Sequence, residues 1–127
     1  MASACYPIGK TACMTKLVNL VTDDMSAFLV DTADYTYSAA HSGLSDLSAA
    51  AREEGVALAG MAVSGGVFDA TDATFTAAAG DGIEAIVIYS ATADRLLAYI
   101  DLGQTILLNG GDIVVTWDDG ANKIFAY

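Results

Sequence analysis

The residues of this chain that could do chemistry are few, and their spacing does not favour an active site. His41 is the single histidine, and no cysteine or second histidine near it completes a metal-ligand set. As a general base, His41 would need an orienting carboxylate and a nucleophile. Asp46 and several serines are present, but in no pattern typical of such a pair. We therefore predict that the protein is not an enzyme and that His41 lies at the surface or in an interface.

The two cysteines, Cys5 and Cys13, lie in one short N-terminal segment. A disulfide between them would leave the rest of the chain unconstrained, so we predict reduced thiols in a protein made in the cytoplasm. Lys10 and Lys16 flank Cys13, which gives weak support for an activated thiolate. A buried or idle thiol is the better interpretation. The N-terminus also lacks the pattern of a secretory signal.

Pairs of acidic residues and pairs of glycines could indicate a calcium site and a phosphate-binding loop. Calcium takes about six to eight oxygens at a suitable spacing, and the acidic pairs of this chain form no EF-hand or repeat-loop pattern, so no dedicated metal and no cofactor is predicted. Asp118-Asp119-Gly120 is more simply a hairpin turn. The acidic pairs are Asp23-Asp24, Glu53-Glu54, Asp118-Asp119, Asp69 with Asp72, and Asp31 with Asp34. The glycine pairs at 65–66 and 110–111 do not open a helix and are not followed by Lys-Ser or Lys-Thr. They predict tight turns, not phosphate-binding loops.

Charge is unevenly distributed along the chain. Residues 1–22 contain Lys10 and Lys16 and no acid, whereas the rest holds all sixteen acids against three basic residues. The formal net charge of −11 disfavours nucleic acid as a partner. No stretch approaches the roughly 18 apolar residues of a membrane span. The acids serve solubility, or the basic N-terminal region docks on an acidic neighbour such as another copy.

Short apolar runs separated by tight-turn signals fill the chain from residue 74 onward, which is typical of a compact antiparallel β-domain. We predict a mainly all-β fold, an antiparallel β-sandwich with a jelly roll as one form of it. A length of 127 residues favours one domain, so residues 1–22 are expected to form an arm or short helix and residues 23–127 the sandwich. Strands are predicted at 25–32, 56–63, 67–69, 73–78, 83–90, 95–102, 105–108, 112–117 and 123–126.

The strand at 83–90 is apolar on both faces in its middle, so we expect it to be central in a sheet. Strict alternation places Glu84, Ile86 and Ile88 on one face. It places Ile83 and Ala85 on the other.

Residues 33–55 form the irregular part of the sequence, with a short helix predicted within 44–55 and Gly55 as its stop. A connection of this length is often functional. Tyr35, Tyr37 and His41 supply large amphipathic side chains of the kind that interfaces favour, so we expect a partner to contact this segment.

Aromatic side chains mark the C-terminal region. Trp117 is expected in the core, with its indole N–H bonded to one partner. Phe125 and Tyr127 make the terminus apolar. We therefore expect the last strand to pair in a sheet or to dock on another subunit.

Four short sequence motifs follow one another in this chain. They are an Asn-Leu-x-Thr-Asp motif, a predicted strand with Val-Asp, a Tyr…Ala-His…Leu-x-Asp segment and a terminal Trp…Gly…Ile-Phe motif. Over residues 17–127 the chain resembles a group of small bacteriophage and prophage proteins found among virion structural genes. The matching residues are Asn19, Leu20, Thr22, Asp23, Asp31, Tyr35, His41, Leu44, Asp46, Tyr99, Asp101, Trp117, Gly120, Ile124 and Phe125.

This resemblance implies a virion component of a tailed phage, made in the host cytoplasm and placed on the capsid surface, and it carries over no catalytic residue. The most specific expectation is a capsid cement or decoration protein that bridges subunits of the major capsid protein as a homo-oligomer, with a trimer favoured. A tail, neck or fibre-associated subunit is the alternative, as is a receptor- or carbohydrate-binding module. The expected interface residues are Lys10, Lys16, Tyr35, Tyr37, His41, Phe125 and Tyr127.

Overall fold

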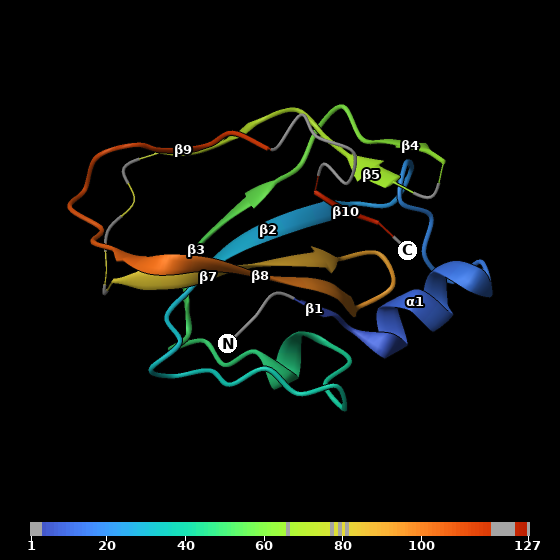
Figure 1. The fold of residues 1–127 in the computed structure, drawn as a ribbon, viewed down its shortest axis with the longest axis horizontal. Helices are drawn as coiled ribbons and strands as arrows, with labels where there is room; N and C mark the ends of the chain where they lie inside the picture. The colour runs from blue at the N-terminus through green and yellow to red at the C-terminus, as the bar shows by residue number, and fades with distance from the viewer. Residues whose placement is uncertain are drawn as a thin grey trace.

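A five-stranded antiparallel sheet forms the centre of the molecule, in the order β1-β8-β7-β2-β3 (Figure 1). The computed structural model describes residues 4–65, 67–76, 78, 80, 82–117 and 124–126, with residues 125 and 126 described by their backbone. The predicted mainly-β, antiparallel fold is confirmed. The strands of the central sheet are β1 (Ala4–Cys5), β2 (Met25–Val30), β3 (Arg52–Ala57), β7 (Ile83–Ser90) and β8 (Arg95–Ile106).

Two smaller sheets cover one face of the central sheet. They have the orders β10-β5-β4 and β6-β9, and Figure 1 shows them as an upper layer, which gives the arrangement of a sandwich. The last strand pairs with β5, as predicted for the apolar C-terminus. These strands are β4 (Ala62–Ser64), β5 (Val67–Asp69), β6 (Ala73–Phe75), β9 (Ile113–Val115) and β10 (Phe125–Ala126).

The connection from β2 to β3 runs along the opposite face, below the sheet in Figure 1. The helix predicted within 44–55 is wrong. The chain makes only the 3₁₀ turn η1 (Leu44–Asp46) and then enters β3, where Glu54 pairs with Leu29 of β2. Backbone pairing with a central strand therefore outweighs the helix preference of this Ala- and Glu-rich stretch.

For residues 1–22 an arm or a short helix was expected, and the described part contains a short helix that packs on the sheet. Ala4 pairs with Tyr99 of β8, and helix α1 (Pro7–Met14) follows with proline in its first turn. A Cβ at Gly9 would lie 2.5 Å from the carbonyl oxygen of Leu96. The glycine thus lets the helix approach β8 closely. No helix among the described residues is long and apolar enough to span a bilayer.

Each face of the central sheet buries its own set of side chains. The face under the smaller sheets, which we name the aliphatic face, packs Ala27, Leu29, Ile86, Ile88 and Ala98 against Phe68, Phe75 and Trp117. The face under residues 31–51, which we name the tyrosine face, packs Val30, Ala85, Val87, Tyr89 and Tyr99 against Tyr6, Tyr35, Leu47 and Ala51. The predicted core position of Trp117 is confirmed, and its indole N–H donates to the carbonyl of Thr71 at 3.1 Å.

The pairing of β7 with β8 contains a large bulge. Between the pairs Ile83–Ile106 and Ala85–Asp101, the single residue Glu84 lies opposite residues 102–105 of β8. The strands predicted separately at 95–102 and 105–108 are therefore one bulged strand over most of that range. The bulge also changes the alternation, because Ile83 packs with Ile86 on the aliphatic face and not with Ala85.

Candidate functional site

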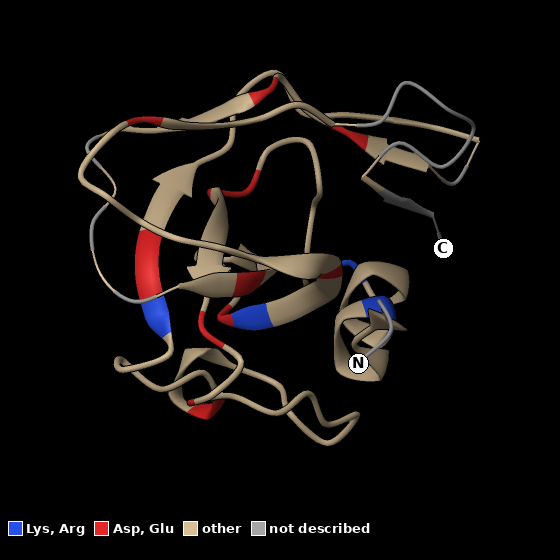
Figure 2. Ribbon diagram, turned by 60° about the vertical axis from the view of Figure 1, so that its left-hand side comes forward, with Lys and Arg blue, Asp and Glu red and all other residues tan. Residues whose placement is uncertain are grey.

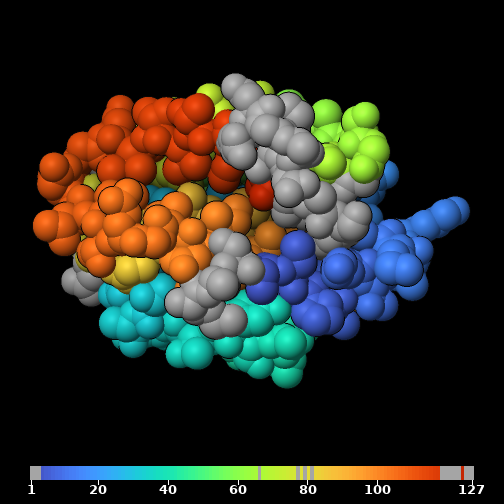
Figure 3. Space-filling model, viewed as in Figure 1, coloured from blue at the N-terminus to red at the C-terminus, as the bar shows by residue number. Residues whose placement is uncertain are grey.

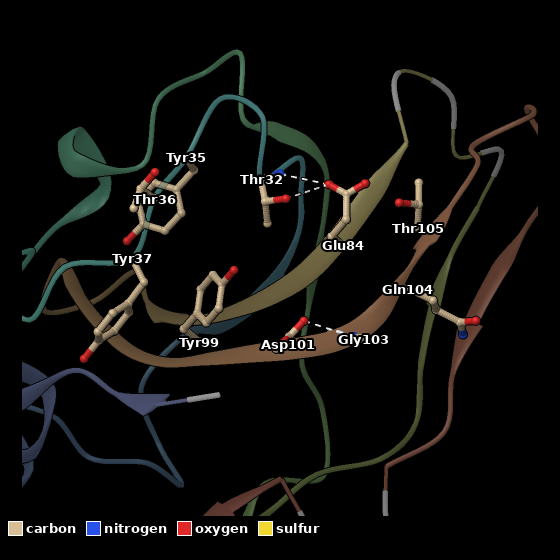
Figure 4. Close-up of a pocket in the computed structure, with 10 residues that line it drawn as sticks. All are labelled: Thr32, Tyr35, Thr36, Tyr37, Glu84, Tyr99, Asp101, Gly103, Gln104 and Thr105. Atoms are coloured by element: carbon tan, nitrogen blue, oxygen red, sulfur yellow. Dashed lines mark hydrogen bonds between the residues drawn. The ribbon is translucent and has the colours of Figure 1, made fainter. Parts of the chain in front are cut away.

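A groove of about 550 Å³ opens where the bulge separates β7 from β8 (Figure 4). Strict alternation would place Glu84 on the face opposite Ala85, but the bulge brings it to the side of Tyr99 and Asp101. We name this hollow the acidic groove. Its lining residues are Thr32, Tyr35, Thr36, Tyr37, Glu84, Tyr99, Asp101, Gly103, Gln104 and Thr105.

Glu84 is held in the acidic groove by hydrogen bonds. One of its oxygens, Oε1, accepts hydrogen bonds from the backbone N–H of Thr32 at 3.0 Å and from the Thr32 hydroxyl at 2.9 Å. Burial raises the pKa of Glu84, but hydrogen bonds from Thr32 and Thr105 outweigh burial and leave the pKa below its usual value. Glu84 therefore carries its negative charge at neutral pH.

Asp101 and Tyr99 form the floor of the acidic groove, two residues apart on β8. The Asp101 carboxylate accepts a hydrogen bond at 3.0 Å from the backbone N–H of Gly103, which adopts a positive φ of 71° within the bulge. Tyr99 is 3% exposed, and Figure 4 shows its hydroxyl directed into the hollow. Among the described residues, no hydrogen-bond partner is found for that hydroxyl. Burial, followed by the charges of Asp101 and Glu84, raises the pKa of Tyr99.

Further carboxylates gather beside the acidic groove. One oxygen each of Asp31, Asp34 and Glu53 lies within 4.8 Å of the other two, and the Asp31 side chain lies close to Glu84. Calcium takes about six to eight oxygens, and carboxylates gather at surfaces without an ion, so we assign no metal to this cluster. Its effect on the acidic groove is to add negative potential.

Tyr35, Tyr37 and His41 are brought together by the fold, but they point into the tyrosine face. The Tyr35 hydroxyl bonds both to the hydroxyl of Tyr6 and, at 2.9 Å, to Nδ1 of His41. Tyr37 donates to the carbonyl of Cys5 at 3.0 Å. Tyr35 is 5% exposed, so its ring belongs to the core and not to the exposed contact predicted for it. Tyr37 and His41 are half-buried and keep part of their surface.

A second hollow lies at the C-terminal end of α1, and apolar side chains surround it. Met14 is 84% exposed, and Leu17, Val21 and Val63 are about half exposed. We name these four residues the α1-end patch. The hollow beside it has about 570 Å³ and is lined by Cys13, Lys16, Val18, Asn19, Leu20, Val21 and Val63.

Lys16 has an unusual backbone conformation at this end of the helix. The N–H of Leu17 bonds to the carbonyl of Ala12 at 2.9 Å, and the N–H of Lys16 bonds to that of Cys13. This is the Schellman arrangement, whose left-handed position usually holds glycine. Here Lys16 occupies that position with a φ of 69°. The chain thus presents a cation beside an apolar hollow at some cost in backbone strain.

The remaining predicted positions are less informative. The backbone of Phe125 pairs with Phe68 in the β10-β5 sheet, whereas Tyr127 lies outside the described residues. Cys5 and Cys13 are thiols and not a disulfide, as predicted. Burial raises the pKa of the Cys5 thiol, which makes it a poorer nucleophile.

The side chains of the acidic groove are suited to binding a ligand. The described lining of the acidic groove offers carboxylates, hydroxyls and an amide, and it includes no histidine, cysteine or basic side chain. His41 faces Tyr35, and that pair belongs to a hydrogen-bonded chain inside the protein. Such groups hold a ligand by hydrogen bonds and charge.

Sequence reasoning missed the acidic groove because its parts are joined by a long-range strand register. The available signals were the acidic residue Glu84 inside an apolar strand and the i, i+2 spacing of Tyr99 and Asp101. The uneven distribution of charge did point to Lys10 and Lys16 as interface residues. The exposed apolar side chains around them were not predicted. Comparison with protein-family models, with curated proteins and with solved structures finds no match for this chain.

Proposed function

We propose that this protein is a structural subunit of a tailed-phage virion and works by binding, without catalysis. The most specific form of the proposal is a capsid cement protein that bridges neighbouring subunits of the major capsid protein. The motif resemblance over residues 17–127 supports the virion, and the α1-end patch supports a docking role. A tail, neck or fibre-associated position would use the same surface in a ring or spike.

The observation that carries the docking role is the combination of exposed apolar surface and positive charge at one end of an acidic molecule. Among the described residues, Lys10 and Lys16 are the exposed basic side chains, and Figure 2 shows no acidic residue on α1. Figure 3 shows the blue N-terminal segment projecting at this end. Contiguous exposed apolar side chains mark interaction sites more often than they mark bare surface.

The expected partner surface is apolar at its centre and acidic around it. Val21, Val63 and Leu17 would supply the desolvated centre, and Lys16 would supply charge complementarity at the rim. Specific interfaces bury about 800 Å² per partner. A homotrimer would present three such contacts at once, so modest individual affinities would combine into stable attachment.

Point substitutions in the α1-end patch test this proposal in phage particles from a genome that encodes the chain. Deletion of the N-terminal residues is unsuitable, because Tyr6 and Ala12 belong to the core. We expect Val63→Asp to lower occupancy on the particle at least about tenfold, as loss of a central contact does. The matched control is Val114→Asp, which changes a 62% exposed valine on β9.

The outcomes separate clearly. The proposal is supported if the wild-type protein is found in purified particles, if Val63→Asp lowers its occupancy and if Val114→Asp does not. Absence of the wild-type protein from particles contradicts the virion role. Equal occupancy for all three proteins contradicts the docking surface.

A further inference from the structure

We propose that the acidic groove binds the ammonium or guanidinium group of a basic side chain on a partner polypeptide. This site lies apart from the α1-end patch and does not depend on the virion proposal. Three features carry the inference: the shape of the bulge, the charge around it and the hydroxyl of Tyr99.

The bulge gives the acidic groove a built shape. Residues 102–105 loop away from Glu84, and the hydrogen bond from Gly103 N–H to Asp101 holds that loop in place. Bulges of this kind re-aim side chains beside binding sites. The volume of about 550 Å³ admits one long side chain with the adjoining backbone of its peptide.

The charge of the acidic groove selects a cation. Glu84 and Asp101 line it from two strands, and the cluster of Asp31, Asp34 and Glu53 lies beside Glu84. The described lining contains no basic side chain. An anionic ligand would meet the like charges of Glu84 and Asp101, whereas a basic side chain would form charge-assisted hydrogen bonds with them.

The Tyr99 hydroxyl supplies an independent sign of a ligand. Its residue is 97% buried, its hydroxyl points into the hollow in Figure 4, and no partner for the hydroxyl lies among the described residues. The ring is buried while the hydroxyl opens into the acidic groove, where a ligand can hydrogen-bond to it. The phenol oxygen can accept from the same N–H cluster that Glu84 and Asp101 bind.

A saccharide fits these observations less well. Sugar rings commonly stack on an exposed aromatic face, but Tyr35 and Tyr99 are 5% and 3% exposed. Tyr37 is half-buried, and its hydroxyl donates a hydrogen bond to the backbone carbonyl of Cys5. The acidic groove therefore offers charge and hydrogen bonds more than a stacking platform.

Amide chemical shifts of the whole protein provide the test, with short capped peptides as probes. One peptide carries a central lysine, one a central arginine and one a norleucine, in otherwise identical glycine-serine sequences. We expect the lysine and arginine peptides to shift the amides of residues 32–37 and 101–105, with weaker binding at higher salt. The norleucine peptide should leave them unchanged.

Variants assign the contacts. Asp101→Asn and Glu84→Gln each remove a charged partner, so we expect about tenfold weaker binding. Tyr99→Phe keeps the ring and should weaken binding about fivefold. Asp24→Asn changes the net charge equally at the opposite end of β2, and it should leave affinity unchanged. If Glu84→Gln does not fold, Asp101→Asn decides, because its side-chain oxygen can still accept from Gly103.

Several results would overturn the inference. Equal binding of the norleucine peptide, or equal weakening by Asp24→Asn, would show that the charge of the acidic groove does not select the ligand. Absence of any shift would exclude the site. Binding of n-butylamine as tight as that of the lysine peptide would assign the site to free amines, and binding of calcium without peptide binding would assign it to a metal.

Discussion

The two faces of the central sheet are both buried, but different kinds of contact stabilise them. On the aliphatic face, Leu29, Ile86 and Ile88 pack under further strands, and their stability comes from burial of apolar area, which has no directional requirement. On the tyrosine face, the covering element is the connection 31–51, which has few regular backbone hydrogen bonds.

On the tyrosine face, side-chain hydroxyl groups supply hydrogen bonds that the irregular connection lacks in its backbone. Tyr6, Tyr35 and His41 form a hydrogen-bonded chain, and Tyr89 donates to Asp94, which also accepts from the N–H of Leu44. Aromatic rings bury large apolar areas, and their hydroxyls fix the loop in one position. The comparison teaches that an irregular segment can cover a sheet when its contacts are directional.

Alkaline pH should have the largest effect, and it should act first on the tyrosine face. Burial, followed by the hydrogen bond to Asp94, raises the pKa of Tyr89 to about 12, and burial also raises the pKa of Tyr6, Tyr35 and Tyr99. A raised pKa means that the folded protein holds the proton more tightly than the unfolded chain. This stability is complete below pH 10 and is lost as the pH rises through 12.

Absorbance at 295 nm and fluorescence of Trp117 follow the two faces separately during this titration, since the tryptophan lies on the aliphatic face. We expect tyrosinate formation to be steep and to coincide with the change in fluorescence. Gradual ionisation near pH 10, with constant fluorescence, would show that the tyrosines are not held as described.

A cavity in the aliphatic face should have the next largest effect. Ile88 is fully buried there, so we expect Ile88→Ala to lower the free energy of unfolding by about 2–5 kcal/mol. Urea denaturation measures this change, and the near-UV circular dichroism of the native variant should keep the tyrosine signal. A loss below about 1 kcal/mol would mean that this face is loosely packed.

Tyr35→Phe tests the directional contacts of the tyrosine face. It leaves the fully buried hydroxyl of Tyr6 without a partner, so we expect a loss of about 1–3 kcal/mol in denaturant unfolding. The double variant Tyr6→Phe with Tyr35→Phe should lose less than the sum of the two single variants. Strict additivity would mean that the two hydroxyls are not coupled.

Lys16→Gly should have the smallest effect, and it has the opposite sign. Glycine relieves the positive φ of Lys16, so thermal unfolding should show a gain of about 1 kcal/mol. If Lys16 serves docking, the more stable variant will also bind virions less well. Lys16→Asn, which tolerates this conformation without the charge, separates the two effects.

Local patterns predicted some elements closely. The apolar runs at 67–69 and 83–90 coincide with β5 and β7, because turn signals bound them on both sides. The pairing of the C-terminal strand followed from its apolar character. These features depend on near neighbours in the sequence.

Features that depend on distant pairing could not be predicted in the same way. Helix propensity at residues 44–55 concealed β3, whose pairing with β2 is visible only in the fold. The position of Glu84 depends on the register between β7 and β8. The burial of Tyr35 depends on a partner 29 residues away, so its amphipathic character alone suggested a surface.

The outer edge of the sheet has a consequence for handling the protein. β3 is the last strand in the sheet order, and it begins with Arg52, Glu53 and Glu54. The adjacent glutamates on this edge repel the same edge of another molecule, and charged side chains on an edge strand oppose fibril growth. Acidification towards the isoelectric point of about 4.1 removes that repulsion. Precipitates formed there are expected to bind amyloid dyes, whereas neutral stocks are expected to stay clear.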